Sequence, residues 1–197
     1  MIVAWTVRFL ICGSGGSGTL ESAYADRAEE VSAGKVSAAQ TLWETMKGIV
    51  PDDVTFKDKF TKATVSNANL AKYYLRVLER QSKSVDDETI VNPDQGKVNL
   101  EHILPRNPTK GWEHIPAEQY PALVKRLGNL TLLATRLNSK AANAEFGEKQ
   151  KHFAKSAIKI TKDLCGFAAW SEAEIEARQH KLADLAVKAW PGKPRLS

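Results

Sequence analysis

The chain has 197 residues, of which 43% are hydrophobic and 26% are charged. This balance is typical of a folded globular protein, and it excludes a disordered tail, a collagen-like repeat and a disulfide-stapled miniprotein. The net charge of +5 makes a polyanion a plausible partner, so the distribution of that charge matters.

The first half of the chain predicts helices. An apolar stretch predicts a helix over residues 2–12, which is too short to cross a bilayer because a spanning helix needs ~20 residues. It also lacks the basic start and the small-residue cleavage site of a signal peptide. Further helices are expected over residues 20–47 and around Phe56 and Phe60, and Asn67 is expected to cap another helix.

Cys12 and Cys165 belong to no paired-cysteine motif. This argues against a disulfide or a thiolate zinc site and favours a reducing, cytoplasmic setting without membrane association. The polar segment 82–96 contains proline and glycine and is the expected internal boundary.

After this boundary the pattern changes from helix to a short hairpin. Alternating apolar residues predict a strand from Val98 to Ile103, with a bend near Pro105. A long, proline-rich loop over residues 106–121 leads to a turn and a second strand over 127–133. Loops of this length are usually kept for function.

Helices are expected again after the hairpin, first over residues 136–146 and then over about 147–164. Ser171 and Glu174 form a capping-box pattern that predicts a last helix ending at Trp190. The fold class is therefore α+β, predominantly α-helical, with a ββα unit embedded between helical segments. We expect a helical N-terminal region (1–95), a core (96–164) and a C-terminal helix packing on that core (165–197).

Positive charge is concentrated in and after the hairpin. Residues 101–162 contain 11 Lys and Arg against five Asp and Glu, whereas the flanking segments are nearly balanced. Such a local field attracts polyanions such as DNA. It is equally typical of a solvated face on basic helices, so charge alone does not decide between the two.

Four polar residues of the predicted hairpin and helix suggest chemistry: Glu101, His102, Asn129 and Asn138. A histidine can activate water near neutral pH, while a carboxylate and an amide oxygen suit Mg²⁺ or Mn²⁺. On a regular strand Glu101 and His102 would face opposite sides, so their cooperation requires a bend. Each residue taken singly is also common as a surface or turn residue.

The other histidines are weaker candidates. Glu113 and His114 nearly repeat the Glu-His pair, but they lie in the long loop with no alternating strand before them. His152 lies on a basic helix and is interpreted as a phosphate contact or surface residue, and His180 as structural or exposed.

The combined motifs resemble a known family. They are LEHILPRN, RLGNLTLL, LNSKAANAEFGEKQKHF, WSEAEIEARQ and AVKAWP. Together they are similar to the C-terminal HNH nuclease domain of GmrSD-type, modification-dependent restriction endonucleases and related phage-defence nucleases. The resemblance extends from about Asn67 to Pro191.

The resemblance implies a ββα-metal fold that cuts or nicks DNA with one divalent cation, Mg²⁺ or Mn²⁺. By position in the motif, His102 would be the general base, and Glu101 and Asn138 the metal ligands. Asn129 would brace the loop between the strands and the histidine, and Lys140 would contact the scissile phosphate.

The sequence differs from the broader HNH pattern at the two proposed metal ligands, and it lacks one motif that is usual in the family. Glu101 replaces the more common Asp, and Asn138 stands where many such enzymes have His, which favours Mg²⁺ or Mn²⁺ over zinc. Family members usually carry a preceding NTPase-like domain with a DGQQR-type motif. No such motif occurs here, so we expect a fragment of a longer protein or a subunit with a separate partner.

The sequence thus predicts a metal-dependent endonuclease domain of a prokaryotic restriction or phage-defence system that nicks DNA. The residues expected to hold the DNA backbone are Arg106, Arg136, Lys140 and Lys151. The alternative is a catalytically inactive DNA-binding module that uses the same basic surface. An RNA substrate also stays open, because phosphate contacts do not distinguish the two sugars.

Overall fold

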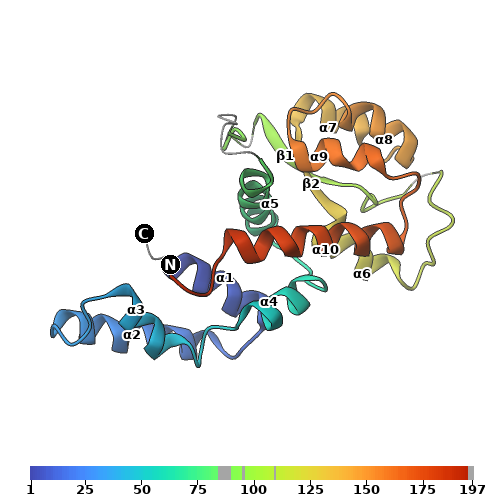
Figure 1. Ribbon diagram of the computed structural model, residues 1–197. Helices are drawn as coiled ribbons and strands as arrows, with labels where there is room; N and C mark the ends of the chain where they lie inside the picture. The colour runs from blue at the N-terminus through green and yellow to red at the C-terminus, as the bar shows by residue number, and fades with distance from the viewer. Residues whose placement is uncertain (84–89, 95, 109, 195–197) are drawn as a thin grey trace. The chain divides into compact units, whose positions relative to one another are not determined.

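The computed structural model describes residues 1–83, 90–94, 96–108 and 110–194 (Figure 1). The fold is mostly helical with a two-stranded antiparallel sheet, which confirms the α+β class. The chain divides into two compact units, Met1–Thr61 with Ala186–Ser197, and Lys62–Leu185. The expected boundary over 82–96 includes residues 84–89 and 95, which lie outside the described residues.

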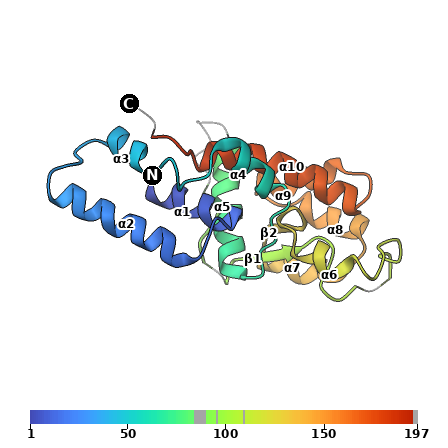
Figure 2. The ribbon, with the colours of Figure 1, turned by 90° about the horizontal axis from the view of Figure 1, so that it is seen from below.

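The first unit is built from short helices (Figure 2). They are α1 (Ile2–Cys12), α2 (Ser17–Ser32), α3 (Ala39–Met46) and α4 (Asp53–Phe60). The helix predicted over 2–12 is confirmed and ends at Gly13, whose φ of 60° suits glycine. The single helix predicted over 20–47 is wrong: Gly34, with φ 72°, lies in the turn that separates α2 from α3.

The core of the first unit contains a buried arginine. Arg8 is fully buried, and its guanidinium binds the carbonyls of Trp190 (2.6 Å) and Pro51 (2.9 Å) and the carboxylate of Asp53. The indole N–H of Trp5 donates to the carbonyl of Gly192 (2.7 Å). These bonds fasten the C-terminal segment onto α1.

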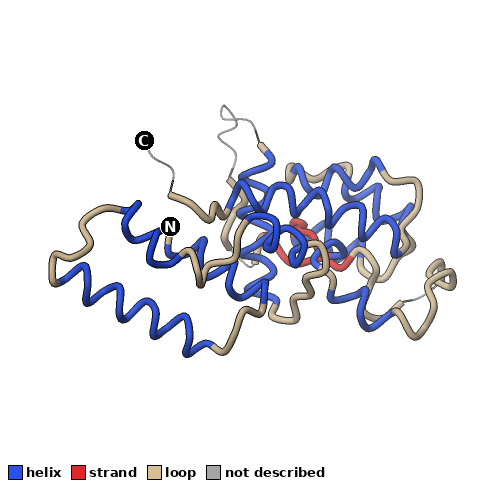
Figure 3. Tube along the Cα trace, turned by 60° about the horizontal axis from the view of Figure 1, so that its bottom comes forward, coloured by secondary structure: helices blue, strands red, loops and turns tan. Residues whose placement is uncertain are grey.

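The second unit contains the sheet, and Figure 3 shows its two strands among helices. Its elements are α5 (Ala68–Ser82), β1 (Val98–His102), α6 (Tyr120–Lys125), β2 (Leu130–Ala134), α7 (Thr135–Ala141), α8 (Phe146–Phe153), α9 (Lys159–Lys162) and α10 (Glu172–Ala189). Short 3₁₀ turns precede β2 (Leu127–Asn129) and follow α9 (Asp163–Gly166). This unit extends beyond the 96–164 segment on both sides.

The two helix caps predicted from the sequence, at the starts of α5 and α10, are present in the structure. The Oδ1 atom of Asn67 accepts hydrogen bonds from the main chain of Asn69 (2.9 Å) and Leu70 (3.1 Å) at the start of α5. The Ser171 main chain donates to the carboxylate of Glu174 (2.7 Å), which confirms the capping box at the start of α10.

The helices predicted after the hairpin are shorter than expected. The one predicted over 136–146 ends at Ala141, because Ala142 has a positive φ of 32°. The one predicted over 147–164 divides into α8 and α9, and between them the hydroxyl of Ser156 accepts a bond from the main chain of Ile158 (3.1 Å). Such local side-chain bonds compete with the helical pattern.

The strands pair in a regular register, with Glu101 opposite Thr131 and His102 opposite Leu130. The Ile103 main chain continues the ladder by donating to the carbonyl of Asn129 (3.0 Å). The predicted bend therefore comes after His102, and the side chains of Glu101 and His102 keep the alternation of a regular strand.

A hydrophobic cluster packs the hairpin against its helices. It includes Leu133, Phe146, Phe153, Trp170 and Ile175, all of them buried. Among the described residues, no helix is both long and apolar enough to cross a membrane.

Candidate active site at the outer edge of β1

The edge of β1 that faces away from β2 is bound by side chains of α7 and α8. The Nδ2 atom of Asn138 donates to the carbonyl of Leu100 (3.1 Å), and the Nζ atom of Lys149 donates to the carbonyl of His102 (2.6 Å). Carbonyls two residues apart on one edge of a strand are separated by about 7 Å. The structure therefore places the amide of Asn138 and the ammonium of Lys149 at successive outward-facing carbonyls of this edge.

Glu101 lies between these two groups in sequence and is almost completely buried, with 5% of its surface exposed. Its Oε1 atom accepts a hydrogen bond from Nζ of Lys149 at 2.5 Å, and its carboxylate also accepts one from the His102 main chain. Burial raises the pKa of Glu101 and lowers that of Lys149, while each charge favours the ionised form of the other. The pair thus offsets the cost of burying two charges.

His102 is half-buried at the end of β1. Burial, followed by the positive charges of Arg106 and Lys149, lowers its pKa to about 4. The imidazole is therefore neutral near pH 7, which is the form in which a ring nitrogen can accept a proton. Because the strand stays regular through His102, its side chain leaves the opposite face of β1 from that of Glu101, and the bend expected between the two residues is not present.

Asn129 is fully buried, and both ends of its amide are engaged. Its Oδ1 atom accepts from the main chain of Leu104 (2.7 Å) and from the indole N–H of Trp170 (3.0 Å). Its Nδ2 atom donates to the carbonyl of Leu104 (3.0 Å). Asn129 therefore holds the chain that follows β1, and its side chain is not placed to contact a substrate.

The four basic residues predicted to bind DNA are exposed. Arg136 and Lys140 lie on α7, Lys151 lies on α8, and Arg106 follows β1 close enough to His102 to influence its pKa. Lys151 also pairs with Glu148 on the same helix. All four lie in the second unit, and the charge of Arg106 reaches His102.

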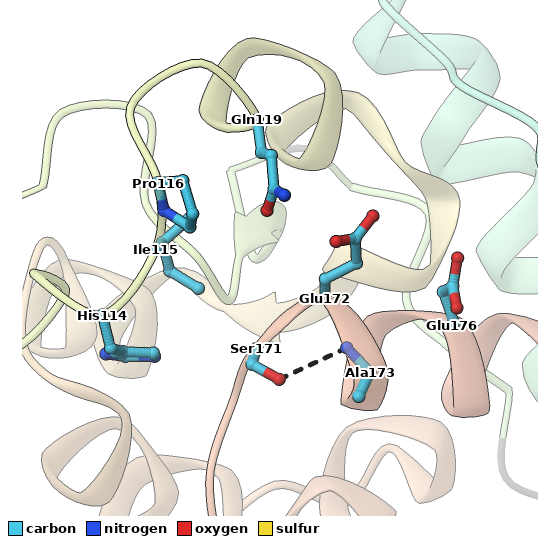
Figure 4. A pocket seen from close by; sticks show the side chains of 8 residues that line it. All are labelled: His114, Ile115, Pro116, Gln119, Ser171, Glu172, Ala173 and Glu176. Carbon is cyan, nitrogen blue, oxygen red and sulfur yellow. Dashed lines mark hydrogen bonds between the residues drawn. The ribbon is translucent and has the colours of Figure 1, made fainter.

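His114 lies apart from this edge, in a polar pocket of about 450 Å³ (Figure 4). Gln119 of the long loop and Glu172 and Glu176 of α10 also line this pocket. The Nε2 atom of His114 is 2.9 Å from the carbonyl of Trp170. The second Glu-His pair thus belongs to a different place in the fold.

Sequence reasoning missed Lys149, the residue with the most direct contact to Glu101. A signal was present, since Lys149 lies three residues after Phe146 and four before Phe153, on the stripe that α8 buries. A lysine at an apolar position of an amphipathic helix indicates a buried partner. Arg178, which binds the carbonyl of Leu130, has the same signal, because it lies three residues after the buried Ile175 and four before the buried Leu182. Trp170, which binds Asn129, has no comparable signal.

The donors at this edge suit a hard cation. They are the carboxylate of Glu101 and the Oδ1 atom of Asn138, because the Nδ2 atom of Asn138 is used by Leu100. In the described part of the chain, no three His, Cys, Asp or Glu side chains gather as a metal site. Two oxygen donors fit Mg²⁺ or Mn²⁺, which retain water ligands, better than zinc.

Residues 50–185 match the family model for GmrSD restriction endonucleases, C-terminal domain. The match covers more than half of the chain and includes the hairpin, α7, α8 and most of α10. No curated protein matches this chain.

Proposed function

Because this chain belongs to the family of GmrSD restriction endonuclease C-terminal domains, we propose that it is a metal-dependent DNA endonuclease of the HNH type. The reaction would take place at the outer edge of β1. The observation that carries the proposal is the arrangement there: Asn138 binds the carbonyl of Leu100, and the next two residues of the strand are Glu101 and His102.

In this proposal His102 is the general base. Its neutral imidazole accepts a proton from a water molecule as the water oxygen attacks phosphorus. The P–O3′ bond breaks, which leaves a 5′-phosphate, and the 3′-oxygen takes a proton from solvent. A pKa of about 4 keeps the imidazole unprotonated throughout the neutral pH range, and it makes the ring a weaker base than an exposed histidine.

Glu101 and Asn138 are the residues that would hold one Mg²⁺ or Mn²⁺. The bound cation supplies positive charge that stabilises the negative charge developing on the leaving oxygen. Asn129 keeps the chain after β1 in place through its bonds to Leu104. Its role in the reaction is therefore one of positioning.

The basic residues around the edge would hold the DNA backbone. Lys140 is proposed to contact the scissile phosphate, and Arg106, Arg136 and Lys151 the flanking phosphates. With one such edge per chain, a single molecule would nick one strand. We also propose that an NTPase-like domain or subunit, as in other GmrSD-type enzymes, delivers the DNA.

The test is a plasmid-nicking assay with Mg²⁺ or Mn²⁺, applied to His102→Ala and Asn138→Ala. A general base contributes about 10²–10⁴-fold, so nicking by His102→Ala should fall by that amount. His114→Ala is the matched control, because this histidine also follows a glutamate but lies in the separate pocket. Wild-type nicking rates in both site variants would refute the assignment.

One observation favours a second candidate function, a DNA-binding module without activity. Lys149 already occupies the carboxylate that a metal would need. Such a module would bind DNA equally well in the presence of EDTA and yield no product with any divalent cation. The same nicking assay, run beside a DNA-binding measurement in EDTA, distinguishes the two functions.

A further inference from the structure

Lys149 makes an unusual pair of contacts for a lysine. Its side chain has no exposed surface, and its ammonium binds two groups of adjacent strand residues. These are Oε1 of Glu101 at 2.5 Å and the carbonyl of His102 at 2.6 Å. The helical stripe that carries Lys149 is otherwise apolar, with Phe146 before it and Phe153 after it.

The charge balance of this edge depends on that contact. A buried carboxylate without a partner is strongly unfavourable, so removing one member of a buried ion pair is strongly destabilising. Because the Glu101 side chain is only 7% exposed, solvent does little to stabilise its charge. Lys149 thus supplies the positive charge that a divalent cation on Glu101 would also supply.

We propose that Lys149 is the built-in counter-ion of Glu101, and that the carboxylate exchanges this ammonium for the divalent cation when the site is loaded. The inference rests on the proposed function, since it concerns the same metal ligand. Lys149 is then a positioning residue. It allows the domain to fold without metal, and it lowers the affinity of the site for metal by competing for the carboxylate.

The chemistry of an ammonium suits this exchange. A lysine ammonium has three N–H donors, so it can keep its bond to the His102 carbonyl after Glu101 turns to another cation. The strand that carries the proposed base therefore stays anchored in both states. A permanent structural pair would instead leave Glu101 unable to bind metal.

The experiment compares four proteins: the wild type, Lys149→Met, Glu101→Gln and the double variant. Mn²⁺ binding is measured by electron paramagnetic resonance, and thermal unfolding is followed in EDTA and in Mn²⁺. Lys155→Met is the matched control, because Lys155 is an exposed lysine just after the end of α8 with no proposed role at the site. None of these measurements depends on nuclease activity.

Lys149→Met should bind Mn²⁺ at least ~10-fold more tightly than the wild type, because a competing charge a few ångströms away is removed. Its melting temperature should also rise with Mn²⁺ by more than that of the wild type. The double variant should lose both effects, and Lys155→Met should behave as the wild type. Unchanged or weaker Mn²⁺ binding by Lys149→Met overturns the proposal.

Two further outcomes are decisive. If Lys149→Met does not fold in EDTA, Mn²⁺ should restore cooperative unfolding; failure to do so, while the double variant folds, overturns the counter-ion role. If Glu101→Gln binds Mn²⁺ as the wild type does, the metal site of the proposed function is wrong. Weakened binding by Glu101→Gln together with unchanged binding by Lys149→Met refutes the counter-ion role alone.

Discussion

The two outer edges of the hairpin are bound by side chains in different ways. On β2, Arg178 donates to the carbonyl of Leu130 (2.8 Å) and Thr161 donates to that of Leu132 (2.6 Å). On β1, the corresponding carbonyls of Leu100 and His102 are bound by Asn138 and Lys149. Both edges are therefore protected from pairing with another strand.

The two edges differ in the polar side-chain groups that they carry besides the donors to their carbonyls. Arg178 is 4% exposed and also binds the carbonyls of Gly128 (2.5 Å) and Ile160 (3.4 Å), so its described partners are all main-chain oxygens. Burial lowers its pKa to about 9, which still leaves it charged at neutral pH. At the β2 edge, the hydrogen bonds of Arg178 therefore serve to hold main-chain carbonyls in place.

The β1 edge, in contrast, contains a carboxylate and an amide oxygen in addition to the bonds that protect it. Asn138 is half-buried rather than enclosed, and the carboxylate of Glu101 is paired with the ammonium of Lys149. The β2 edge therefore fixes the hairpin, while the β1 edge carries the groups suited to chemistry. Substitutions in these two regions are expected to differ in their effect on the free energy of unfolding and on nicking.

The largest effect is expected for Arg178→Met. The substitution leaves the carbonyls of Gly128, Leu130 and Ile160 buried without this donor, which should lower the free energy of unfolding by about 3–5 kcal/mol. Urea unfolding measures the loss, with the exposed His180→Met on the same helix as control. A loss of less than ~1 kcal/mol would show that Arg178 does not hold the β2 edge.

A smaller loss is expected for Gly128→Ala, which tests how closely α10 approaches the turn before β2. An added Cβ would lie 2.4 Å from the carbonyl oxygen of Ile175 and 2.9 Å from Cβ of Gln179. Because the nearer atom belongs to the backbone, we expect a loss near the upper end of the ~1–3 kcal/mol typical of overpacking.

Gly147→Ala is the matched control for this substitution. A Cβ at Gly147 meets nothing within 4 Å, and its place inside α8 makes alanine favourable by up to about 1 kcal/mol. The two glycine variants should therefore shift the urea midpoint in opposite directions. Equal shifts would contradict the close approach of α10.

The sequence predicted those parts of the fold that depend on local signals. The helix cap at Asn67 and the Ser171–Glu174 capping box need only a few neighbouring residues, and both were read correctly. The break after Ala141 was missed, because alanine at Ala142 gives no warning of a positive φ. Chain direction there is set by tertiary packing and not by propensity.

Only part of the candidate site could be predicted, because some of its contacts are local in sequence and others depend on tertiary packing. The adjacent pair Glu101 and His102 is visible in the sequence, but the regular strand directs their side chains to opposite faces of β1. The contact with Lys149 joins residues 48 positions apart, so only the packing of α8 on the hairpin brings them together. The metal and the roles of Glu101, His102 and Asn138 stay predictions.

A matched pair of substitutions separates the two edges by function. Asn138→Ala and Thr161→Val each remove one donor to an edge carbonyl, so each should lower the free energy of unfolding by about 1 kcal/mol, or up to ~2 kcal/mol for the fully buried Thr161. Nicking should fall roughly 100-fold or more for Asn138→Ala alone, because only Asn138 is proposed to hold the cation. Equal nicking by the two folded variants would remove the distinction between the edges.

The smallest effect is expected for Glu174→Gln, at the start of the helix that carries Arg178. Hydrogen bonds from Ser171 lower the pKa of Glu174, so the unfolded chain binds the proton more readily than the folded one. The resulting stabilisation is present above the ordinary glutamate pKa of about 4.3 and is lost as the pH falls below it.

In urea unfolding near pH 7 the Glu174→Gln variant should be less stable than the wild type by roughly 0.5–1 kcal/mol, which is typical of a helix cap. This difference in stability should shrink by about pH 3. Glu172→Gln, at an exposed position of the same helix turn, is the control. A difference between Glu174→Gln and the wild type that does not change with pH would mean that the carboxylate charge has no part in anchoring α10.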